Sequence, residues 1–512
     1  MSARATFIDR AIGWLSPEAG LRRVRHRAAM DVLTRDYAGA DRGRLKSSWK
    51  TRSTSADAEI AKAGRILRDR MRDLVRNNPH AANAISVLVT HAIGDGIVPR
   101  AKDPKVNALF AEWIKVCDAD ESLDFYGIQA LAARGMFESG DGLVRRRRRR
   151  AEDSLPVPLQ LQVLETDLID STKEGTLSGG GLIIQGIEFD AIRRRRAYWM
   201  FGSHPGNSFF DPHLSIVSKP VPADDIAHVF EKQRTQVRGA PWGAPVIADL
   251  HDLASYEQAE LVRKRLEACL VGVMTGAEVD DPVGMAMTGD DGKPLPAGIY
   301  DVHGERVEKF EPGMFYNAVG GKDIEFSQPA ATGSYDAYKT AMLHTIAAGF
   351  RVPHALLTGN LRGVNYSSSK IGIEAFKRTI SALQWQFIIP MLCEPMWRWF
   401  LEAAWLAGKI DHMNHPAEWA PPRMYSADPG RDVDAKLAEV RAGFRSLSSA
   451  IAETGYNPDD VLAEIAADNA KLDKAGIILD SDPRRMSQAG QTQQRREETD
   501  PDDKEDRDDQ DA

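Results

Sequence analysis

A run of six consecutive arginines, Arg145 to Arg150, constrains this chain more than any other feature of its sequence. Residues 142–150 have the character of a β-strand, in which successive side chains alternate between two faces. One face then carries Arg145, Arg147 and Arg149, and the other carries the remaining three. Neither face is apolar, so we expect the strand to lie at the rim of an oligomer, solvated or paired with acids. The alternative is contact with an anionic partner, either DNA or the carboxylates of a neighbouring subunit.

Negative charge is concentrated at the C-terminus. The chain has 512 residues, with 66 Lys and Arg against 74 Asp and Glu, a net charge of −8. Residues 497–512 contain ten acidic and two basic residues and carry that entire charge, so residues 1–496 sum to zero. Tight sequence-independent binding to nucleic acid needs a large surplus of Lys and Arg. We therefore expect any contact with DNA to be local and weak.

Neither a disulfide framework nor a membrane span is predicted. Cys117, Cys269 and Cys393 lie more than a hundred residues apart and form no CxxC pair. Two charged residues interrupt the N-terminal apolar stretch before it reaches the length of a signal peptide. The longest uncharged run, residues 379–393, is shorter than the roughly 20 residues that a membrane helix needs. We expect no contact with a membrane and read this run as a buried helix.

The first half of the chain combines helices with a β-rich region. Residues 56–76 have the spacing of an amphipathic helix, and a second helix begins after Asn78 as the cap and Pro79 as the first residue. Residues 105–137 also look helical. The period then becomes strand-like in four segments, residues 142–150, 159–164, 181–189 and 197–201. The last two flank a polar stretch and predict a hairpin whose basic tip includes Arg193, Arg194 and Arg195.

The second half is expected to be mostly helical. A helix over 249–272 and another over 334–348, ended by Gly349, enclose an insertion rich in Gly, Pro and Asp. A loop over 358–369 leads into the longest helical stretch, 370–407, which Pro390 and Pro395 should kink. Short helices follow, over 429–442, 446–453 and 458–469. The length suggests about three domain-sized units, and the fold class is α+β, mostly helical.

Enzyme signatures are absent from the sequence. There is no phosphate loop, no HExxH and no GxSxG, so no catalytic residue is predicted. Glu165, Asp167 and Asp170 are spaced closely enough to bind a metal, but we favour a solvated or salt-bridged role. His412 and His415 lack further ligands. No metal and no cofactor are therefore expected. Four tryptophans are expected in the core or at a subunit interface: Trp385, Trp397, Trp399 and Trp405. The alternative role for them is stacking on nucleic-acid bases.

Several local strings make the chain resemble the lambda-type family of tailed-phage portal proteins. They are RNNPHAANAISVLVTHAIGDGIVPR (76–100), VLETDLID (163–170), GIEFDAIRRRRAYWMF (186–201) and AAGFRVPHALLTGNLRGVNYSSSK (347–370). The resemblance covers most of residues 50–475. It implies a homo-oligomeric ring of about twelve copies at one vertex of a capsid. In the family such a ring is the channel for double-stranded DNA and the platform for the terminase and the head-tail joining proteins, within a shell of major capsid protein.

The resemblance also implies a division of the chain into portal regions. The regions are an N-terminal arm (1–50), a wing (51–248), a first stem helix (249–272), a clip (273–330), a second stem helix (331–350), a tunnel-loop region (351–369), a long wing helix with the following segment (370–428), crown helices (429–475) and a disordered acidic tail (476–512). The expected location is the virion, and the host cytoplasm during assembly.

The tunnel-loop region supplies the candidate contacts with DNA in the channel. They are Asn360, Arg362, Asn365, Tyr366 and Lys370, because polar groups with one or two cations can touch phosphates without holding them. The alternative for each residue is a local role in turning the chain and capping the next helix. Two other functions remain open. One is a head-tail adaptor or scaffold protein, and the other is a packaging nuclease or ATPase, for which the sequence lacks the motifs.

Overall fold

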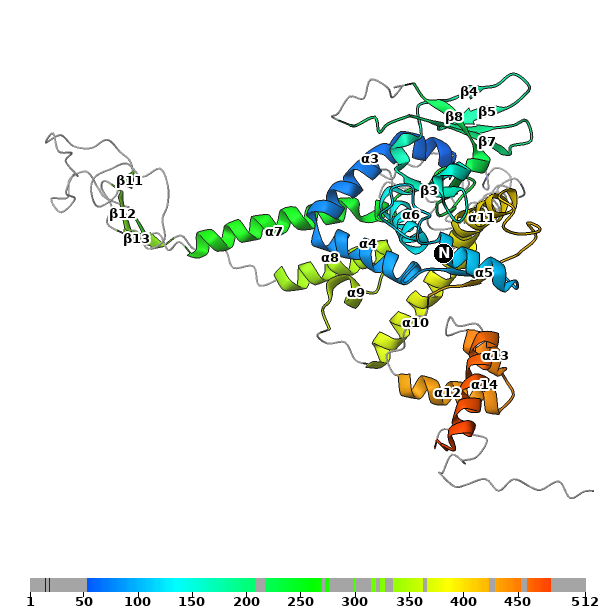
Figure 1. The fold of residues 1–512 in the computed structure, drawn as a ribbon. Helices are drawn as coiled ribbons and strands as arrows, with labels where there is room; N and C mark the ends of the chain where they lie inside the picture. The colour runs from blue at the N-terminus through cyan, green and yellow to red at the C-terminus, as the bar shows by residue number, and fades with distance from the viewer. Residues whose placement is uncertain are drawn as a thin grey trace, which may run out of the picture. The chain divides into compact units, whose positions relative to one another are not determined.

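The computed structural model describes most of the chain between residues 53 and 479. The described residues are 53–207, 217–268, 272–275, 299–300, 315–318, 323–326, 335–361, 366–422, 429–452 and 458–479, together with Trp14 and Glu18. The chain divides into two units, residues 1–55 and 56–512. The helices and strands named below lie in the second unit and are drawn in Figure 1. Among them, no helix is long and apolar enough to cross a membrane.

The first helix pair forms as the sequence predicts. Helix α3 (Ala56–Asn77) is followed directly by α4 (Pro79–Ala92). The Oδ1 atom of Asn78 accepts hydrogen bonds from the backbone N–H groups of His80 and Ala81, at 3.0 and 3.2 Å, which satisfies two donors that the helix itself cannot pair. Both helices bury apolar side chains in the main core.

Residues 105–137, which were predicted to be helical, form two separate helices. Helix α5 (Pro104–Trp113) ends well before α6 (Phe125–Ser139) begins. Between them, the carboxylate of Asp118 accepts hydrogen bonds from three backbone N–H groups, those of Asp120, Ser122 and Leu123. Asp124 then caps α6 by accepting from the N–H of Gly127 at 2.7 Å. Short acidic side chains favour such turns over a continuous helix.

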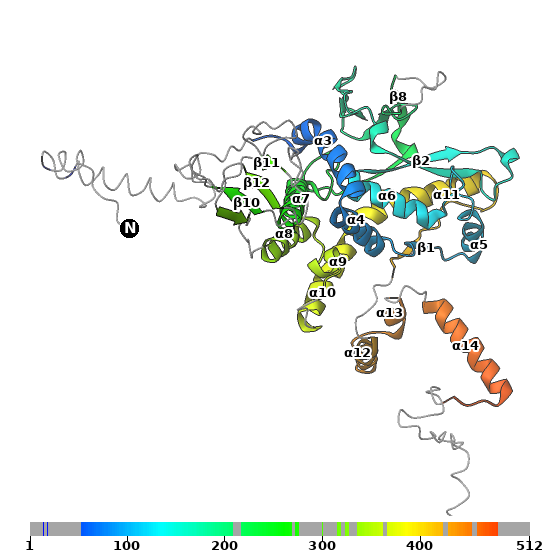
Figure 2. The same ribbon diagram turned by 90° about the vertical axis from the view of Figure 1, so that its left-hand side faces the viewer.

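The arginine-rich strand lies at the centre of a three-stranded antiparallel sheet, in the order β3-β2-β9. The strands are β2 (Gly142–Arg148), β3 (Leu159–Leu164) and β9 (Ile226–Val229). Figure 2 shows α6 and the later helix α11 (Glu394–Leu406) alongside β2. Short 3-10 turns connect these parts of the fold: η3 (Ala151–Asp153), η4 (Thr166–Leu168), η5 (Ala223–Asp225) and η6 (Ala244–Val246).

A second sheet contains five antiparallel strands in chain order. They are β4 (Gly175–Thr176), β5 (Leu182–Ile184), β6 (Ile187–Phe189), β7 (Arg195–Met200) and β8 (Lys219–Pro222). The pairing of β6 with β7 confirms the predicted hairpin, with a register shift next to Phe189. This sheet has its own small core, which includes Ile187, Tyr198 and Val221.

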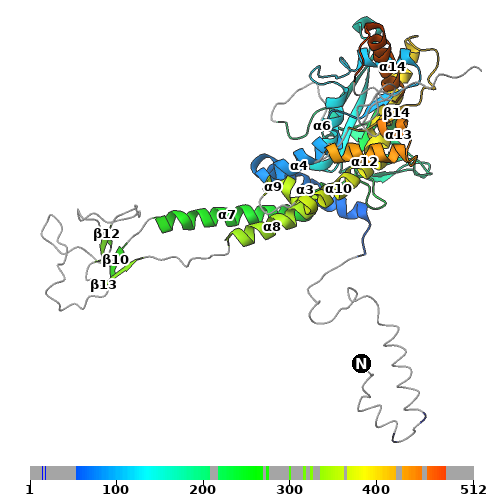
Figure 3. The same ribbon diagram turned by 90° about the horizontal axis from the view of Figure 1, so that it is seen from below.

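Two helices run side by side on either side of the predicted insertion. They are α7 (Ile247–Ala268) and α8 (Tyr335–Phe350), and Figures 1 and 3 both show them adjacent. The described part of the insertion is a four-stranded sheet in the order β11-β12-β10-β13. Its strands are β10 (Gly272–Thr275), β11 (Ile299–Tyr300), β12 (Phe315–Ala318) and β13 (Asp323–Phe326).

The end of α8 differs from the prediction by two residues. The helix runs through Gly349 to Phe350, and the left-handed backbone falls on Arg351, with φ of +59°. Gly349 instead allows close packing, because a Cβ atom there would lie 2.2 Å from Cγ1 of Val246 in η6. A short helix that the sequence did not predict, α9 (His354–Thr358), follows and ends at Gly359, with φ of +67°.

The longest helical stretch is continuous through three segments. They are α10 (Tyr366–Leu383), the π-helical segment η7 (Gln384–Cys393) and α11. The predicted irregularity at Pro390 takes the form of the π-helix, whose wider turns accommodate a residue that cannot donate a backbone hydrogen bond. Strand β14 (Glu418–Ala420) then pairs with β1 (Val98–Arg100), a contact that the sequence did not predict.

Three helices complete the described chain. They are α12 (Pro429–Arg441), α13 (Leu447–Ala452) and α14 (Pro458–Ala475), close to the predicted ranges, although α14 extends beyond residue 469. Helices and separate small sheets together confirm the predicted class, α+β and mostly helical. The acidic segment 497–512 lies outside the described residues.

Candidate functional site

The arginine strand is paired with acids on one face. Arg146 is buried, contrary to the expectation that neither face can enter the core. Its Nε and Nη2 atoms lie 2.9 and 2.8 Å from Oδ1 of Asp225, and its Nη1 lies 2.5 Å from Oε2 of Glu402. Arg148 also binds Asp225, at 3.0 Å, while its side chain stays 63% exposed. Burial is possible because two carboxylates from other elements neutralise the guanidinium.

The opposite face of the strand is held by glutamines. Nε of Arg147 donates to Oε1 of Gln162 at 2.8 Å, and Nε of Arg149 donates to Oε1 of Gln160 at 2.7 Å. Burial and the neighbouring Arg145 and Arg149 lower the pKa of Arg147. Three positive charges therefore lie close together on this face, half-buried, and two of them, on Arg147 and Arg149, have neutral glutamine oxygens as side-chain partners.

Of the three arginines predicted at the basic hairpin tip, two are exposed and the third makes contacts within the protein. Arg193 and Arg194 are exposed, next to a turn in which Oδ1 of Asp190 accepts from the N–H of Arg194 at 2.8 Å. Arg195 is tied into the protein. Its Nη1 donates to the hydroxyl of Tyr198 at 2.7 Å, and its Nη2 donates to the carbonyl of Val237 at 3.0 Å.

A buried polar network lies next to Arg195, and it was not predicted from the sequence. Nε2 of His228 lies 2.9 Å from Oδ1 of Asp141, and Nε of Arg238 donates to Oδ2 of the same carboxylate at 2.8 Å. Nδ1 of His228 lies 3.1 Å from Nη1 of Arg195. Because an arginine can only donate, Nδ1 must be the acceptor, and Nε2 carries the proton that is donated to Asp141. The geometry therefore requires a neutral imidazole.

The pKa shifts in this network follow from burial and charge. Burial lowers the pKa of His228 to about 4, even though Asp141 acts in the opposite direction. Burial would raise the pKa of Asp141, but Arg238, His228 and the backbone N–H of Gly239 outweigh it and hold that pKa well below its ordinary value. The network is closed and fully buried, which makes it a structural tie between the two sheets.

The tunnel-loop region begins from a fixed point. The Nδ2 atom of Asn83 in α4 donates to the carbonyls of Leu356 and Leu357 in α9, at 2.8 and 2.7 Å. Arg351, in the connection from α8 to α9, is also held in place. Its Nη1 lies 2.6 Å from Oε1 of Glu231, and its guanidinium stacks 4.5 Å from the ring centroid of Trp242. These contacts hold α9 on the body of the unit.

The five loop candidates are only partly described. Asn360 is exposed just after α9. Arg362 and Asn365 lie outside the described residues. Tyr366 and Lys370 lie at the start of α10, and their side chains are also outside what is described. The prediction that these residues meet DNA is not tested by the geometry.

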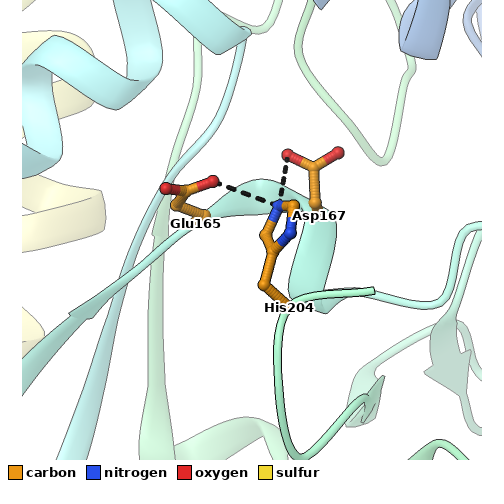
Figure 4. Close-up of side chains that lie close together, drawn as sticks. All are labelled: Glu165, Asp167 and His204. Carbon is orange, nitrogen blue, oxygen red and sulfur yellow. Dashed lines mark ion pairs between the residues drawn. The ribbon is translucent and has the colours of Figure 1, made fainter. Parts of the chain in front are cut away.

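Figure 4 shows that His204 lies next to Glu165 and Asp167, two acids of the predicted cluster. Nε2 of His204 lies 3.2 Å from Oε2 of Glu165 and 3.8 Å from Oδ2 of Asp167. Asp167 also binds two arginines of α3, Arg68 at 3.0 Å and Arg72 at 2.5 Å. Burial would raise the pKa of Asp167, but these two cations outweigh it and lower that pKa. The salt-bridged role is therefore confirmed for Asp167.

The third acid of the predicted cluster points elsewhere. Asp170 accepts hydrogen bonds from the hydroxyls of Ser218 and Thr172, both at 2.6 Å. The three acids therefore do not converge on one point. Asp170 instead fixes the start of β8 against the turn that precedes β4.

The tryptophans divide into two groups. Trp397 and Trp399 are buried in the core, where their indole N–H groups donate to the carbonyls of His415 and Asp224, at 2.9 and 2.8 Å. The core role is confirmed for these two. Trp385 and Trp405 are about half exposed, at 52% and 43%.

The adjacent helices α7 and α8 are joined by charged and aromatic contacts. Nζ of Lys339 lies 2.6 Å from Oε1 of Glu257, which raises the pKa of the lysine. Tyr256 stacks with Tyr335 at 6.0 Å between ring centroids and meets Tyr338 edge to face at 4.7 Å. These contacts join two helices that flank the inserted sheet.

The fold and these sites together define a class of protein: an α+β subunit whose polar clusters brace neighbouring elements, with paired helices on either side of an inserted sheet. The model of the family described as "Phage portal protein, lambda family" matches residues 42–384. The chain belongs to this family.

A curated relative agrees over nearly the whole length. The chain is 28% identical over 472 residues to a protein named "Probable portal protein" from Halomonas phage phiHAP-1, covering 87% of this chain and 88% of the relative.

Two solved structures show a more distant likeness. A chain from the virion of a native gene transfer agent has 16% identity and a TM-score of 0.41, covering 79% of this chain and all of that chain. An HK97-family phage portal protein from Corynebacterium diphtheriae has 12% identity and a TM-score of 0.29, covering 75% of this chain and 99% of that one. We base no functional conclusion on likenesses of this size.

Proposed function

We propose that this chain is the subunit of a portal ring of about twelve copies at one capsid vertex, a structural part without catalytic activity. The ring conducts double-stranded DNA during packaging and ejection. Membership of the lambda portal family, matched over residues 42–384, is the observation that carries the proposal. The work of packaging then belongs to a separate terminase, and the ring is also the platform for head-tail joining proteins.

Exposed apolar side chains support assembly into a ring. On α7, Leu261 and Val262 are 51% and 47% exposed. Phe444, between α12 and α13, is 87% exposed, and Leu462 and Ile465 of α14 are also open to solvent. Apolar side chains gathered on exposed helices mark surfaces that another protein covers. Identical neighbours in a closed ring would cover them on every subunit alike.

The regions of the proposed subunit follow the element order. Helices α7 and α8 form the stem, and the sheet between them belongs to the clip, which faces the terminase and later the connector. Residues 51–248 and the segment from α10 through residue 428 form the wing, and helices α12 to α14 form the crown. The segment that follows α9 faces the channel, and its anchoring through Asn83 gives that segment a fixed starting point.

The contact with DNA is proposed to be weak and independent of sequence. The body of the chain, residues 1–496, has no net charge. Several of its arginines are already engaged, as in the pairs of Arg146 with Asp225 and Glu402. A channel that transports DNA must not bind it strongly, because each fixed cation on a phosphate adds to the affinity.

In this proposal the subunit works in the virion, where the ring is set in the major capsid protein, after assembly in the host cytoplasm. Electron microscopy of the purified protein tests the ring, with mass measurement of the particles for the copy number. We expect closed rings. Monomers at every concentration, together with ATP hydrolysis or DNA cleavage, would overturn the proposal and favour a packaging enzyme. A small open complex would favour a head-tail adaptor or scaffold.

A further inference from the structure

A groove of about 480 Å³ lies between the end of β2 and the C-terminal turn of α11. Its floor is apolar and includes Leu159 and Trp399, both nearly fully buried. Leu155 and Pro156 from the connection to β3 form one wall, and Leu406 of α11 forms the other. The groove therefore joins the arginine strand to the helix that packs beside it.

The base of the groove is rigid because Arg146 holds its two sides together. Its guanidinium binds Asp225 on one side and Glu402 of α11 on the other, and it lies 5.8 Å from the centroid of Trp399. The side chain of Arg146 is 8% exposed. The positive charge of Arg146 is therefore neutralised inside the protein by these two carboxylates, and the groove keeps its shape without an occupant.

The rim of the groove is basic. Arg148, Arg149 and Lys409 all line it, and Glu402 is the one acid among the lining residues. Arg148 is 63% exposed and shares Asp225 with Arg146, while the guanidinium of Arg149 is held by Gln160 on the opposite face of the strand. Three cations, Arg146, Arg148 and Lys409, stand against Glu402 and the carboxylate of Asp225 behind it, so the groove has a net positive charge. It is suited to an anionic occupant.

We propose that the acidic C-terminal segment of this chain, residues 497–512, docks in this groove. Its ten acids and two bases make it the complement of the rim, in a chain whose remaining 496 residues have no net charge. The carboxylates pair with Arg148 and Lys409. Ion pairs above an apolar floor are stronger than those in open water, because the local dielectric is lower.

The chain is long enough for this contact. Twenty-one residues separate the end of α14 at Ala475 from Glu497. Fully extended, they span up to about 70 Å. The segment can therefore occupy the groove of its own subunit or that of a neighbour.

A duplex is a poorer fit to the same groove than an acidic peptide. A DNA helix is too wide to enter a concavity of about 480 Å³, so its phosphates would meet the rim alone and leave the apolar floor uncovered. An occupied groove also has a consequence for the proposed function. The acidic segment covers cations that would otherwise bind nucleic acid without regard to sequence.

The test uses a labelled synthetic peptide of residues 497–512 and the protein truncated after residue 496. Fluorescence anisotropy in 50 mM salt should give saturable binding, weakened at least tenfold in the variant Arg148→Gln/Lys409→Gln. The control variant Arg193→Gln/Arg194→Gln removes two exposed arginines elsewhere and should change the affinity less than twofold. Full-length protein should bind the peptide more weakly than truncated protein, because its own segment competes.

Three results would overturn the inference. One is no binding in 50 mM salt, and the second is equal weakening by both variants, which would mean attraction to any positive surface. The third is a short DNA duplex that binds the groove more tightly than the peptide, with the same dependence on Arg148 and Lys409. Unchanged thermal melting of both variants confirms that they are folded. Ring formation is measured separately by electron microscopy, so failure here is distinguishable from failure of the proposed portal role.

Discussion

Nε2 of His228 lies 2.9 Å from Oδ1 of Asp141, and each of the two side chains is 1% exposed. His228 belongs to β9 of the first sheet, and Asp141 lies immediately before β2. Arg195 from the second sheet approaches the other nitrogen of the same imidazole. One neutral histidine thus connects the two sheets, and its protonation would place a third cation beside Arg195 and Arg238.

Acid should weaken this tie. The pKa of His228 falls from its ordinary 6.5 to about 4 in the folded protein. Between these pH values the unfolded chain binds a proton that the folded chain does not, so stability is lost as the pH falls. From pH 7 to pH 5 this residue alone should lower the free energy of unfolding by about 2 kcal/mol. The lowered pKa of Asp141 acts with the same sign.

Urea unfolding at pH 7, 6 and 5 measures this effect. The variant His228→Asn should be less stable at pH 7 and should lose most of the dependence between pH 7 and 5. The matched control is His251→Asn, which changes a histidine of α7 that is 75% exposed and should leave the dependence as it was. If His228→Asn keeps the full dependence, the titrating group lies elsewhere.

Removing the buried arginine of β2 should destabilise the protein more than removing an exposed one. Arg146→Met leaves Glu402 unpaired and Asp225 with Arg148 as its remaining cation. Because Arg148 still neutralises Asp225, we expect a loss of about 2–3 kcal/mol, at the low end for a broken buried pair. Arg194→Met, at the exposed hairpin tip, should change stability by less than about 0.5 kcal/mol. Equal effects in denaturant titrations would contradict the structural role of Arg146.

Local signals in the sequence were enough to predict many of the elements. Asn78 and Pro79 placed the start of α4, and the polar stretch between two strand-like segments placed the β6–β7 hairpin. In each case the residues that decide the structure are neighbours along the chain. Helices α7 and α8 were predicted to within a few residues at each end, although α8 runs past its predicted stop at Gly349.

The sequence could not predict contacts made by residues far apart. Arg146 was expected outside the core, because its partners Asp225 and Glu402 lie 79 and 256 residues away. The network of His228 was missed because Asp141 is 87 residues distant and neither residue belongs to a motif. The pairing of β1 with β14 joins strands of three residues each, too short to have a detectable period.

A second prediction about packing concerns two glycines in helices. At Gly349 a Cβ atom would lie 2.2 Å from Cγ1 of Val246, whereas at Gly372 in α10 nothing lies within 4 Å. Gly349→Ala should therefore cost about 1–3 kcal/mol by forcing α8 away from η6. Gly372→Ala should stabilise α10 by about 0.5–1 kcal/mol, because alanine is the better helix former. Thermal melting of both variants decides this, and a stabilising Gly349→Ala would show that the two elements are not in contact.

The affinity for DNA should fall with salt concentration along a shallow slope, because few cations contact the phosphates. If the loop after α9 meets the duplex, then Arg362 and Lys370 each neutralise about one phosphate. The variant Arg362→Gln/Lys370→Gln should then reduce the slope of log affinity against log salt by about 2, with equal loss for all sequences. The control Arg193→Gln/Arg194→Gln removes the same charge at the hairpin tip and should leave the slope unchanged. Gel-shift titrations from 25 to 200 mM salt measure both, on rings verified by microscopy. A slope that changes only in the control would place the DNA contact on the hairpin and refute the loop assignment, since the two variants differ in position and not in charge.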